Sequence, residues 1–336
     1  MTPVASGKRI SGYGPVSSRD AGPNIECTVA SPRDWLMAQA ATRLGRLNRF
    51  DFVRRGRRQA LSLMAREGFT VRAQFPLGIG LDLPCWDCNL LAALLAGRVF
   101  DPMLVSVLRS VACPGAVVVD GGAHIGIYAI TAAKLMEGQG TVIAFEPDPR
   151  NFALLQRNIN LNGMQSAIQA EQIALSDSDG ETEMWVAEDV STCGSLVSMH
   201  LPSHRCIRVR STCLDSYVSF MRIPRIDLLK LDLEGAEPAC LRGARKSVQL
   251  ANTLVFELNA PRLKAQGLIP HEVVMEFISS GNFSEAFLLD ESEGRAIRWD
   301  GGHDLELLLE VTGFVNVLLS RDGGPFSLGG LDHTHD

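Results

Sequence analysis

A run of three valines that ends in a carboxylate and a glycine turn most constrains the fold of this chain. Residues 117–126 read Val-Val-Val-Asp-Gly-Gly-Ala-His-Ile-Gly, and apolar residues at helical spacing follow. β-Branched residues favour a buried strand, and glycines permit a sharp turn that lets a ligand approach the main chain. The first N–H groups of the next helix would then face that ligand. The segment therefore predicts a strand, a turn and a helix with a binding site at the turn.

Two acids near this turn indicate the kind of ligand. A second apolar run, 141–145, ends in Glu146, and an acid at the tip of the second strand commonly binds a nucleoside ribose. A dinucleotide site would favour the spacing Gly-x-Gly-x-x-Gly, whereas Gly121 and Gly122 are adjacent here. Asp120 before them would repel a pyrophosphate but suits a cationic amine or sulfonium. S-adenosyl-L-methionine (SAM) is therefore the predicted cofactor, and a dinucleotide or a vestigial nucleotide fold are the alternatives.

Composition and charge exclude several classes of protein. The 336 residues are 46% hydrophobic and 21% charged, which is typical of a globular protein with a full core. A net charge of −6 gives no reason to expect a nucleic acid partner. No apolar run reaches the roughly eighteen residues of a membrane span, so none is expected. The lone Cys85-x-x-Cys88 lacks a second pair for zinc, and the eight cysteines lack disulfide spacing, which predicts a cytoplasmic protein.

Composition also divides the chain into four predicted parts. Residues 1–32 are rich in Ser, Gly and Pro, lack the layout of a signal peptide and predict a disordered leader. Residues 33–112 predict an extension of helices and a hairpin that caps the core. The main domain is predicted over 113–321, and residues 322–336 predict a flexible tail.

The predicted extension begins with an arginine-rich helix over 33–66. A solvated helix face that balances an acidic body is the favoured interpretation, and an anchor for an acidic partner, a membrane surface or a nucleic acid is the alternative. Loose alternation over 71–83, with two glycines, predicts a short hairpin. Helical spacing recurs over Asn89–Ala96 and Pro102–Val111.

From residue 113 the pattern alternates between strands and helices. Such alternation specifies a mostly parallel sheet with helices on both faces, so we predict an α/β, Rossmann-like fold with seven strands. Two further runs with β character, 181–187 and 205–211, predict a hairpin after the third strand. The strands of the sheet are predicted at 116–120, 141–145, 168–173, 226–231, 252–257, 284–289 and 314–320, and the helices at 125–136, 149–162, 237–248 and 270–279.

A second polar segment ends the fourth predicted strand. Residues 226–237 read Ile-Asp-Leu-Leu-Lys-Leu-Asp-Leu-Glu-Gly-Ala-Glu, so Lys230, Asp232 and Glu234 alternate with leucines and share one side of the chain. Charged side chains on a mostly buried strand are costly unless they are paired. The carboxyl end of a central parallel strand is also where such sheets bind ligands. These three residues are therefore the candidate catalytic groups.

A third polar segment ends the next strand, where Glu257 and Asn259 follow an apolar run. Either side chain could face the same crevice, or the two could be a loop acid and a turn asparagine. Oxygen ligands from Asp232, Glu257 and Asn259 would suit magnesium or calcium. This metal site is an alternative, and the main prediction includes no metal.

The order of these motifs resembles the FkbM-type SAM-dependent methyltransferases. Val118–Gly126 is similar to the family's Asp-x-Gly-Ala-x-x-Gly turn, Phe145–Pro147 to its second-strand acid motif, and Lys230–Glu237 to its most recognisable block. The resemblance covers roughly residues 75–320 and implies a class I methyltransferase fold with SAM as cofactor. His124 stands where the family often has asparagine.

The resemblance implies site residues and a reaction. The implied reaction is O-methylation of a hydroxyl on a sugar, glycan or natural product, so a small-molecule or glycan acceptor is the expected partner. The cofactor would be bound by the turn, by the second-strand acid and by the third-strand loop. The residues concerned are Asp120, Gly121, Gly122, His124, Gly126, Glu146 and Ala174.

Methyl transfer from a sulfonium is an in-line displacement, which needs a positioned acceptor and a base for its proton. We expect Asp232 to be the base and Lys230 to orient it, with Glu234, Glu257 and His124 as alternatives. Two rival functions stay open. One is a non-catalytic SAM-binding scaffold, and the other is a nicotinamide-dependent oxidoreductase.

Overall fold

The computed structural model describes residues 24–26, 70–84, 87, 90, 101–187, 194–199 and 204–321. The chain divides into two compact units, one of Met1–Val99 with Glu188–Thr192 and one of Phe100–Ala187 with Cys193–Asp336. Four predicted features lie outside the described residues wholly or almost wholly. They are the leader over 1–32, the helix over 33–66, the helical segment Asn89–Ala96 and the tail over 322–336.

The first unit contains a three-stranded antiparallel sheet. Its strands are β1 (Asn24–Glu26), β2 (Thr70–Phe75) and β3 (Ile79–Pro84). The hairpin predicted over 71–83 is confirmed. Leu77 and Gly78, at φ 63° and 67°, turn the chain. Arg72 and Asp82 lie opposite each other across the strands, with Nε 2.7 Å from Oδ1, so an ion pair fixes the register.

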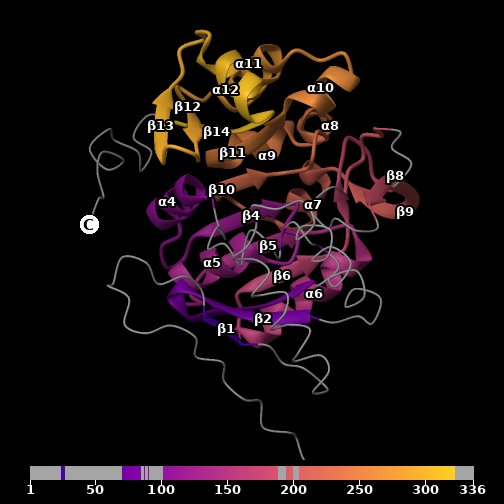
Figure 1. The fold of residues 1–336 in the computed structure, drawn as a ribbon, viewed down its shortest axis with the longest axis vertical. Helices are drawn as coiled ribbons and strands as arrows, with labels where there is room; N and C mark the ends of the chain where they lie inside the picture. The colour runs from indigo at the N-terminus through magenta and orange to yellow at the C-terminus, as the bar shows by residue number, and fades with distance from the viewer. Residues whose placement is uncertain are drawn as a thin grey trace, which may run out of the picture. The chain divides into compact units, whose positions relative to one another are not determined.

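The second unit is built on an eight-stranded sheet with the order β13-β12-β14-β11-β10-β4-β5-β6 (Figure 1). Its strands are β4 (Val117–Gly121), β5 (Thr141–Phe145), β6 (Ile168–Glu171), β10 (Ile226–Leu231), β11 (Ala251–Asn259), β12 (Glu285–Asp290), β13 (Arg295–Arg298) and β14 (Phe314–Ser320). All seven predicted strands are present, so the mostly parallel Rossmann-like sheet is confirmed. β14 runs antiparallel to both of its neighbours, β11 and β12, and the edge strand β13 runs antiparallel to β12.

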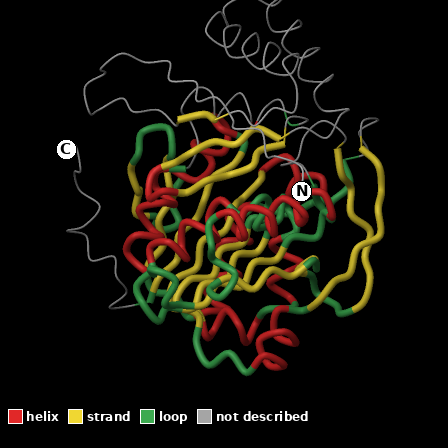
Figure 2. Tube along the Cα trace, turned by 90° about the horizontal axis from the view of Figure 1, so that it is seen from below, coloured by secondary structure: helices red, strands yellow, loops and turns green. Residues whose placement is uncertain are grey.

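Helices lie on both sides of this sheet (Figure 2). They are α4 (Pro102–Val111), α5 (Ile127–Leu135), α6 (Pro149–Leu161), α7 (Leu214–Met221), α8 (Glu237–Arg242), α9 (Arg245–Leu250), α10 (Ala260–Ala265), α11 (Pro270–Gly281) and α12 (Asp304–Thr312). The single helix predicted over 237–248 is wrong, because α8 ends at Arg242 and Gly243 follows it. A Cβ there would lie 2.2 Å from the main-chain oxygen of Ser176, so only glycine lets the chain pass and restart as α9.

A second, smaller sheet of this unit has the order β7-β9-β8. Its strands are β7 (Ala174–Leu175), β8 (Gly180–Ala187) and β9 (His204–Thr212). β8 and β9 confirm the predicted hairpin and form the two long strands at the right of Figure 2. The strand predicted over 168–173 is too long, because β6 ends at Glu171 and the chain resumes as β7 in this other sheet.

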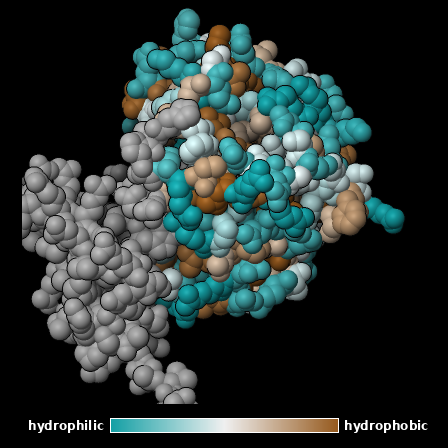
Figure 3. All heavy atoms as spheres, turned by 90° about the vertical axis from the view of Figure 1, so that its right-hand side faces the viewer, coloured by the Kyte–Doolittle hydropathy of each residue, from teal (hydrophilic) through white to brown (hydrophobic). Residues whose placement is uncertain are grey.

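The core of the second unit lies between the large sheet and its helices. Leu229, Leu231 and Phe256 are fully buried on the central strands, and Phe256 stacks on Phe277 of α11 with ring centroids 4.1 Å apart. Central parallel strands are covered on both faces, which explains their almost continuous apolar sequence. The face seen in Figure 3 is mainly hydrophilic, with hydrophobic residues scattered over it. Among the described residues, no helix is long and apolar enough to cross a membrane.

Candidate functional site

The turn after β4 is fixed by glycines with left-handed backbone conformations. Gly122 has φ 75° and Gly126 has φ 94°. A Cβ on Gly122 would lie 1.9 Å from the main-chain oxygen of Asp232, and one on Gly126 would lie 2.7 Å from Cδ1 of Leu155. The Gly122 N–H donates to the carbonyl of Phe145 at 3.0 Å. Glycine is therefore required for this turn to fit between the ends of β5 and β10.

Glu146, which follows β5, ties the turn to the start of α6. Its Oε2 accepts from the N–H of His124 at 2.8 Å and its Oε1 from the N–H of Asp148 at 2.9 Å. Glu146 is only 4% exposed, and burial raises its pKa to about 7, although both N–H groups oppose that shift. Each carboxylate oxygen has a second lone pair. Glu146 is thus both a structural tie and a candidate ligand of the ribose.

Asp120 and Lys230 form a buried ion pair on the adjacent strands β4 and β10. Lys230 Nζ lies 3.0 Å from Asp120 Oδ1, and the two side chains are 5% and 2% exposed. Among the described residues, no donor other than the Lys230 ammonium contacts the Asp120 carboxylate. Burial lowers the pKa of Lys230, but Asp120 and Asp232 outweigh it and raise that pKa above its ordinary value. A buried carboxylate with one ammonium partner still has oxygen lone pairs that suit the cationic amine of SAM.

Asp232 lies one residue beyond β10, on the same side of the chain as Lys230. Its Oδ2 is 3.6 Å from Lys230 Nζ, and its side chain is 34% exposed. Leu231, between them, is fully buried in the core. The predicted alternation of charged and apolar residues in this segment is therefore confirmed. It presents a partly exposed carboxylate next to a buried cation.

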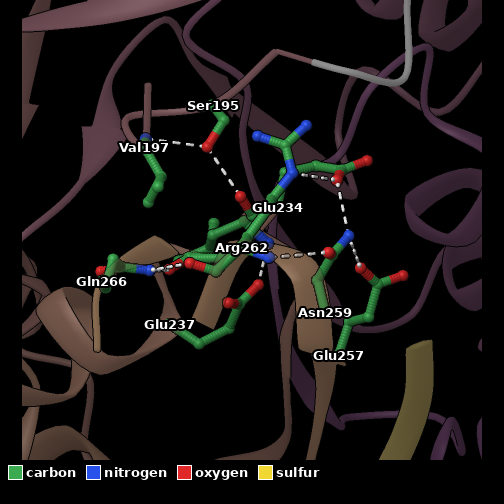
Figure 4. A network of polar contacts seen from close by, with 10 residues as sticks. Ser195, Val197, Glu234, Glu237, Glu257, Asn259, Arg262 and Gln266 are labelled. Atoms are coloured by element: carbon green, nitrogen blue, oxygen red, sulfur yellow. Dashed lines mark hydrogen bonds and ion pairs between the residues drawn. The ribbon is translucent and has the colours of Figure 1, made fainter. Parts of the chain in front are cut away.

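Three carboxylates gather where β10 and β11 end. Asp232, Glu234 and Glu257 each offer an oxygen within 4.8 Å of the others. Arg262 Nε lies 3.3 Å from Glu234, and Asn259 Nδ2 donates to Glu234 and Glu257 at 3.4 and 3.5 Å (Figure 4). Burial, and then the charge of Asp232, raise the pKa of Glu234 to about 7 and that of Glu257 well above its ordinary value. Burial and the crowding of like charges thus favour proton uptake by Glu234 and Glu257.

The loop after β10 is held from several sides. Glu237 begins α8, as predicted, and its Oε1 accepts from the N–H of Leu233 at 2.6 Å. Burial raises the pKa of Glu237 to about 8. Ser195, on the connection between β8 and β9, donates to the main-chain oxygen of Glu234 at 2.6 Å (Figure 4). Glu234 itself has a φ of 54°, so these contacts fix an unusual backbone conformation.

The structure does not place the side chain of Ala174 at the glycine turn. It lies in β7 and packs with Met184 and Val186 of β8. Its neighbour Leu175 lies beside the turn instead, since its Cδ1 is 2.9 Å from the position of a Cβ on Gly121. The role of Ala174 as a cofactor contact stays a prediction.

Three residues of the site were not predicted. Arg262 comes from α10, and the hydroxyl of Tyr128 in α5 donates to Asp101 Oδ2 at 2.7 Å. The Tyr128 ring centroid lies 5.2 Å from Lys230 Nζ. The available signals were a tyrosine directly after the glycine turn and an Asp-Pro step before α4. The Asp-Pro step is typical of an ordinary helix cap.

Comparison with known proteins supports the cofactor assignment. The protein-family model of the methyltransferase FkbM domain matches residues 120–287 of this chain. Methyltransferase 1 of Beauveria bassiana is 27% identical over 198 residues, which cover 54% of this chain and 72% of that protein. The 2-O-methyltransferase NoeI of Sinorhizobium fredii is 24% identical over 194 residues, which cover 53% of this chain and 75% of that protein. The hexuronic acid methyltransferase AglP of Haloferax volcanii is 24% identical over 141 residues, which cover 42% of this chain and 55% of that protein.

The matched region is half of the chain and contains the glycine turn, Glu146 and the block from Lys230 to Glu237. The predictions of a methyltransferase and of SAM as its cofactor are confirmed. The buried Asp120 and the glycine turn are the features of the structure that fit this cofactor. This chain therefore belongs to the FkbM family of SAM-dependent methyltransferases.

Proposed function

We propose that this enzyme methylates a hydroxyl oxygen on a sugar, glycan or natural product, with Asp232 as the base. The observation that carries this proposal is the difference in exposure along β10. Asp232 is 34% exposed and can meet an acceptor, whereas its neighbour Lys230 is 5% exposed and already paired with Asp120. The names of two relatives, a 2-O-methyltransferase and a hexuronic acid methyltransferase, support the substrate class.

The cofactor residues in this proposal are Asp120, Gly121, Gly122, His124, Gly126, Glu146 and Ala174. SAM supplies an activated methyl group on a sulfonium. Asp120 offers buried oxygens to the amine, and Glu146 offers its remaining lone pairs to the ribose. The N–H of His124 holds Glu146 in place.

Asp232 accepts the hydroxyl proton as the acceptor oxygen attacks, since a neutral sugar hydroxyl is a weak nucleophile. Lys230 Nζ, 3.6 Å from Asp232 Oδ2, orients the Asp232 carboxylate toward the acceptor. Glu234 and Glu257 are nearby alternatives, and the pKa of Glu234, which burial raises to about 7, suits a group that exchanges protons near neutral pH.

A divalent metal is the second candidate, because oxygens from three acids lie within 4.8 Å of one another. The ligand set differs from the one predicted from sequence. Asn259 directs its Nδ2 at the acids, and its Oδ1 accepts from the N–H of Arg262 at the start of α10. Glu234 therefore takes the place of Asn259 beside Asp232 and Glu257.

The test is to incubate the protein with methyl-labelled SAM and methyl glycosides of glucuronic acid, fucose and glucose, and also with a cell extract. We expect label in an O-methyl ether. Label on nitrogen or carbon would contradict O-methylation, and SAM binding without transfer to any acceptor would favour the scaffold alternative. Repeating the reaction with a chelator separates the two mechanisms, because activity that only magnesium or calcium restores would make Asp232 a metal ligand.

A further inference from the structure

Asp101 occupies the N-cap position of α4 but does not cap the helix. An aspartate at this position normally accepts from the second or third N–H of its helix, and Asp101 makes no such bond. Glu291, at the end of β12, does so instead. Its Oε2 accepts from the N–H of Met103 at 2.8 Å and its Oε1 from that of Leu104 at 3.2 Å. The start of α4 is thus satisfied without Asp101, whose carboxylate can serve another purpose.

The Asp101 carboxylate is directed toward the site already described. The Tyr128 hydroxyl donates to its Oδ2 at 2.7 Å, and the Tyr128 ring contacts Lys230, whose Nζ is 3.6 Å from Asp232. Tyr128 and Lys230 therefore link the two acids through direct contacts. Both acids are partly exposed, whereas Lys230 is buried between them. One acid comes from the segment before α4 and the other from the end of β10.

Holding a second acid here has an energetic cost. Burial raises the pKa of Asp101, the bond from Tyr128 opposes the shift, and the charge of Asp232 raises the pKa further. The local structure gains no helix cap in return, because Glu291 supplies that cap. A partly buried acid that its own helix does not need is characteristic of a ligand-binding group.

We propose that Asp101 is a second acceptor-binding carboxylate, which accepts a hydrogen bond from a hydroxyl adjacent to the one that Asp232 deprotonates. This inference rests on the proposed O-methylation. It narrows the substrate class to polyols with neighbouring hydroxyls, such as sugars. An acceptor with a single hydroxyl leaves Asp101 with the Tyr128 hydroxyl as its donor, so its complex has one charge-assisted hydrogen bond fewer and is weaker. Tyr128 acts as a positioning residue for Asp101.

The test compares methyl glucuronoside, or methyl fucoside if it is turned over faster, with its mono-deoxy analogues as acceptors. The wild-type enzyme should show a KM at least about tenfold higher for the analogue that lacks the adjacent hydroxyl. Asp101→Asn should raise KM about tenfold for the intact sugar, with a smaller change in kcat, and should make the two acceptors nearly equivalent. Its affinity for SAM, measured by calorimetry, should not change.

Two further variants separate binding from structure. Tyr128→Phe removes the hydroxyl that positions Asp101, and it should raise the acceptor KM, as Asp101→Asn does. Glu291→Gln weakens the cap of α4 and should lower Tm with the acceptor KM unchanged. An Asp101→Asn variant that only loses Tm, or that still discriminates against the deoxy analogue, overturns the inference and leaves the proposed function standing. If the wild-type enzyme methylates none of these sugars, the proposed sugar acceptor is wrong and the inference is wrong with it.

Discussion

The carboxylates on the two sides of the site are held in opposite ways. On the side that we propose for the cofactor, Glu146 accepts from two main-chain N–H groups, which the turn and α6 fix in place. On the side that we propose for the acceptor, Glu234 and Glu257 share the Asn259 side chain, Arg262 contacts Glu234, and the two acids crowd one another. Main-chain donors cannot leave without unfolding the turn, whereas side-chain donors can exchange partners. The cofactor side is thus preorganised, and the acceptor side is able to change its charge.

Asp232→Asn gives the largest expected effect and tests the acceptor side. The change keeps the size of the side chain and removes its basicity, so the methylation rate should fall by about two to four orders of magnitude. SAM affinity should change little. Asp177→Asn is the matched control, because its carboxylate forms an exposed ion pair with Arg242 and should leave the rate unchanged. If Asp232→Asn keeps a near-normal rate with the true acceptor, Asp232 is not the base, and Glu234, Glu257 or His124 becomes the candidate for that role.

Gly122→Ala tests how rigid the cofactor side is. The new Cβ would meet a main-chain oxygen at 1.9 Å in a left-handed residue, so the free energy of unfolding should fall by about 2 kcal/mol or more. Gly163→Ala is the control, since Gly163 has φ 68° and open space where the added methyl group would lie. It isolates the backbone cost of about 1 kcal/mol. If urea unfolding shows the same loss of unfolding free energy in both variants, the turn can shift to accommodate the added Cβ.

Glu146→Ala tests the binding role of the cofactor side. SAM affinity should fall by about 1–3 kcal/mol, the range for hydrogen bonds to charged groups. Calorimetry on the folded variant measures this loss. Glu181→Ala, which removes a side chain that is 65% exposed, is the control and should bind SAM normally. Unchanged SAM affinity in a folded Glu146→Ala protein would remove Glu146 from the cofactor site.

The pH dependence of stability sharpens the comparison further. The folded pKa values of Glu146, Glu234 and Glu291 are raised to about 7 and that of Glu237 to about 8. A raised folded pKa contributes stability that is complete below the unfolded pKa and is lost as pH rises through the folded value. Without SAM, Tm should therefore fall between about pH 5 and pH 8. Glu237→Gln should flatten that fall, and a Tm that rises over this range would contradict the shifts.

The sequence predicted the cofactor side more completely than the acceptor side. The turn and Glu146 depend on contacts between neighbouring strands and on glycines, so local patterns reveal them. Arg262 and Asp101 contact the candidate site only through side chains of distant segments, and the local sequence does not distinguish them from an ordinary helix residue and an ordinary helix cap. The separation of α8 from α9 was missed for the same reason, because the residue that blocks a side chain at position 243 is Ser176.

The prediction of strands from local sequence has the same limit. β5, β10 and β14 were predicted with their correct bounds, because each is an apolar run with clear ends. β13, which reads Arg-Ala-Ile-Arg, is short and half-exposed at the edge of the sheet. Such a segment forms a strand only because β12 is there to pair with it.

The position of β14 has a consequence for how the protein is made. This last strand lies inside the sheet, between β11 and β12, and not at an edge. During synthesis, β12 therefore leaves the ribosome before the strand that joins it to the rest of the sheet exists. β12 and β13 must wait, without the strand that links them to the sheet, until Ser320 has emerged. Folding of the large sheet should accordingly finish only after Ser320 has emerged, and the waiting strands β12 and β13 are where we expect a nascent-chain chaperone to bind.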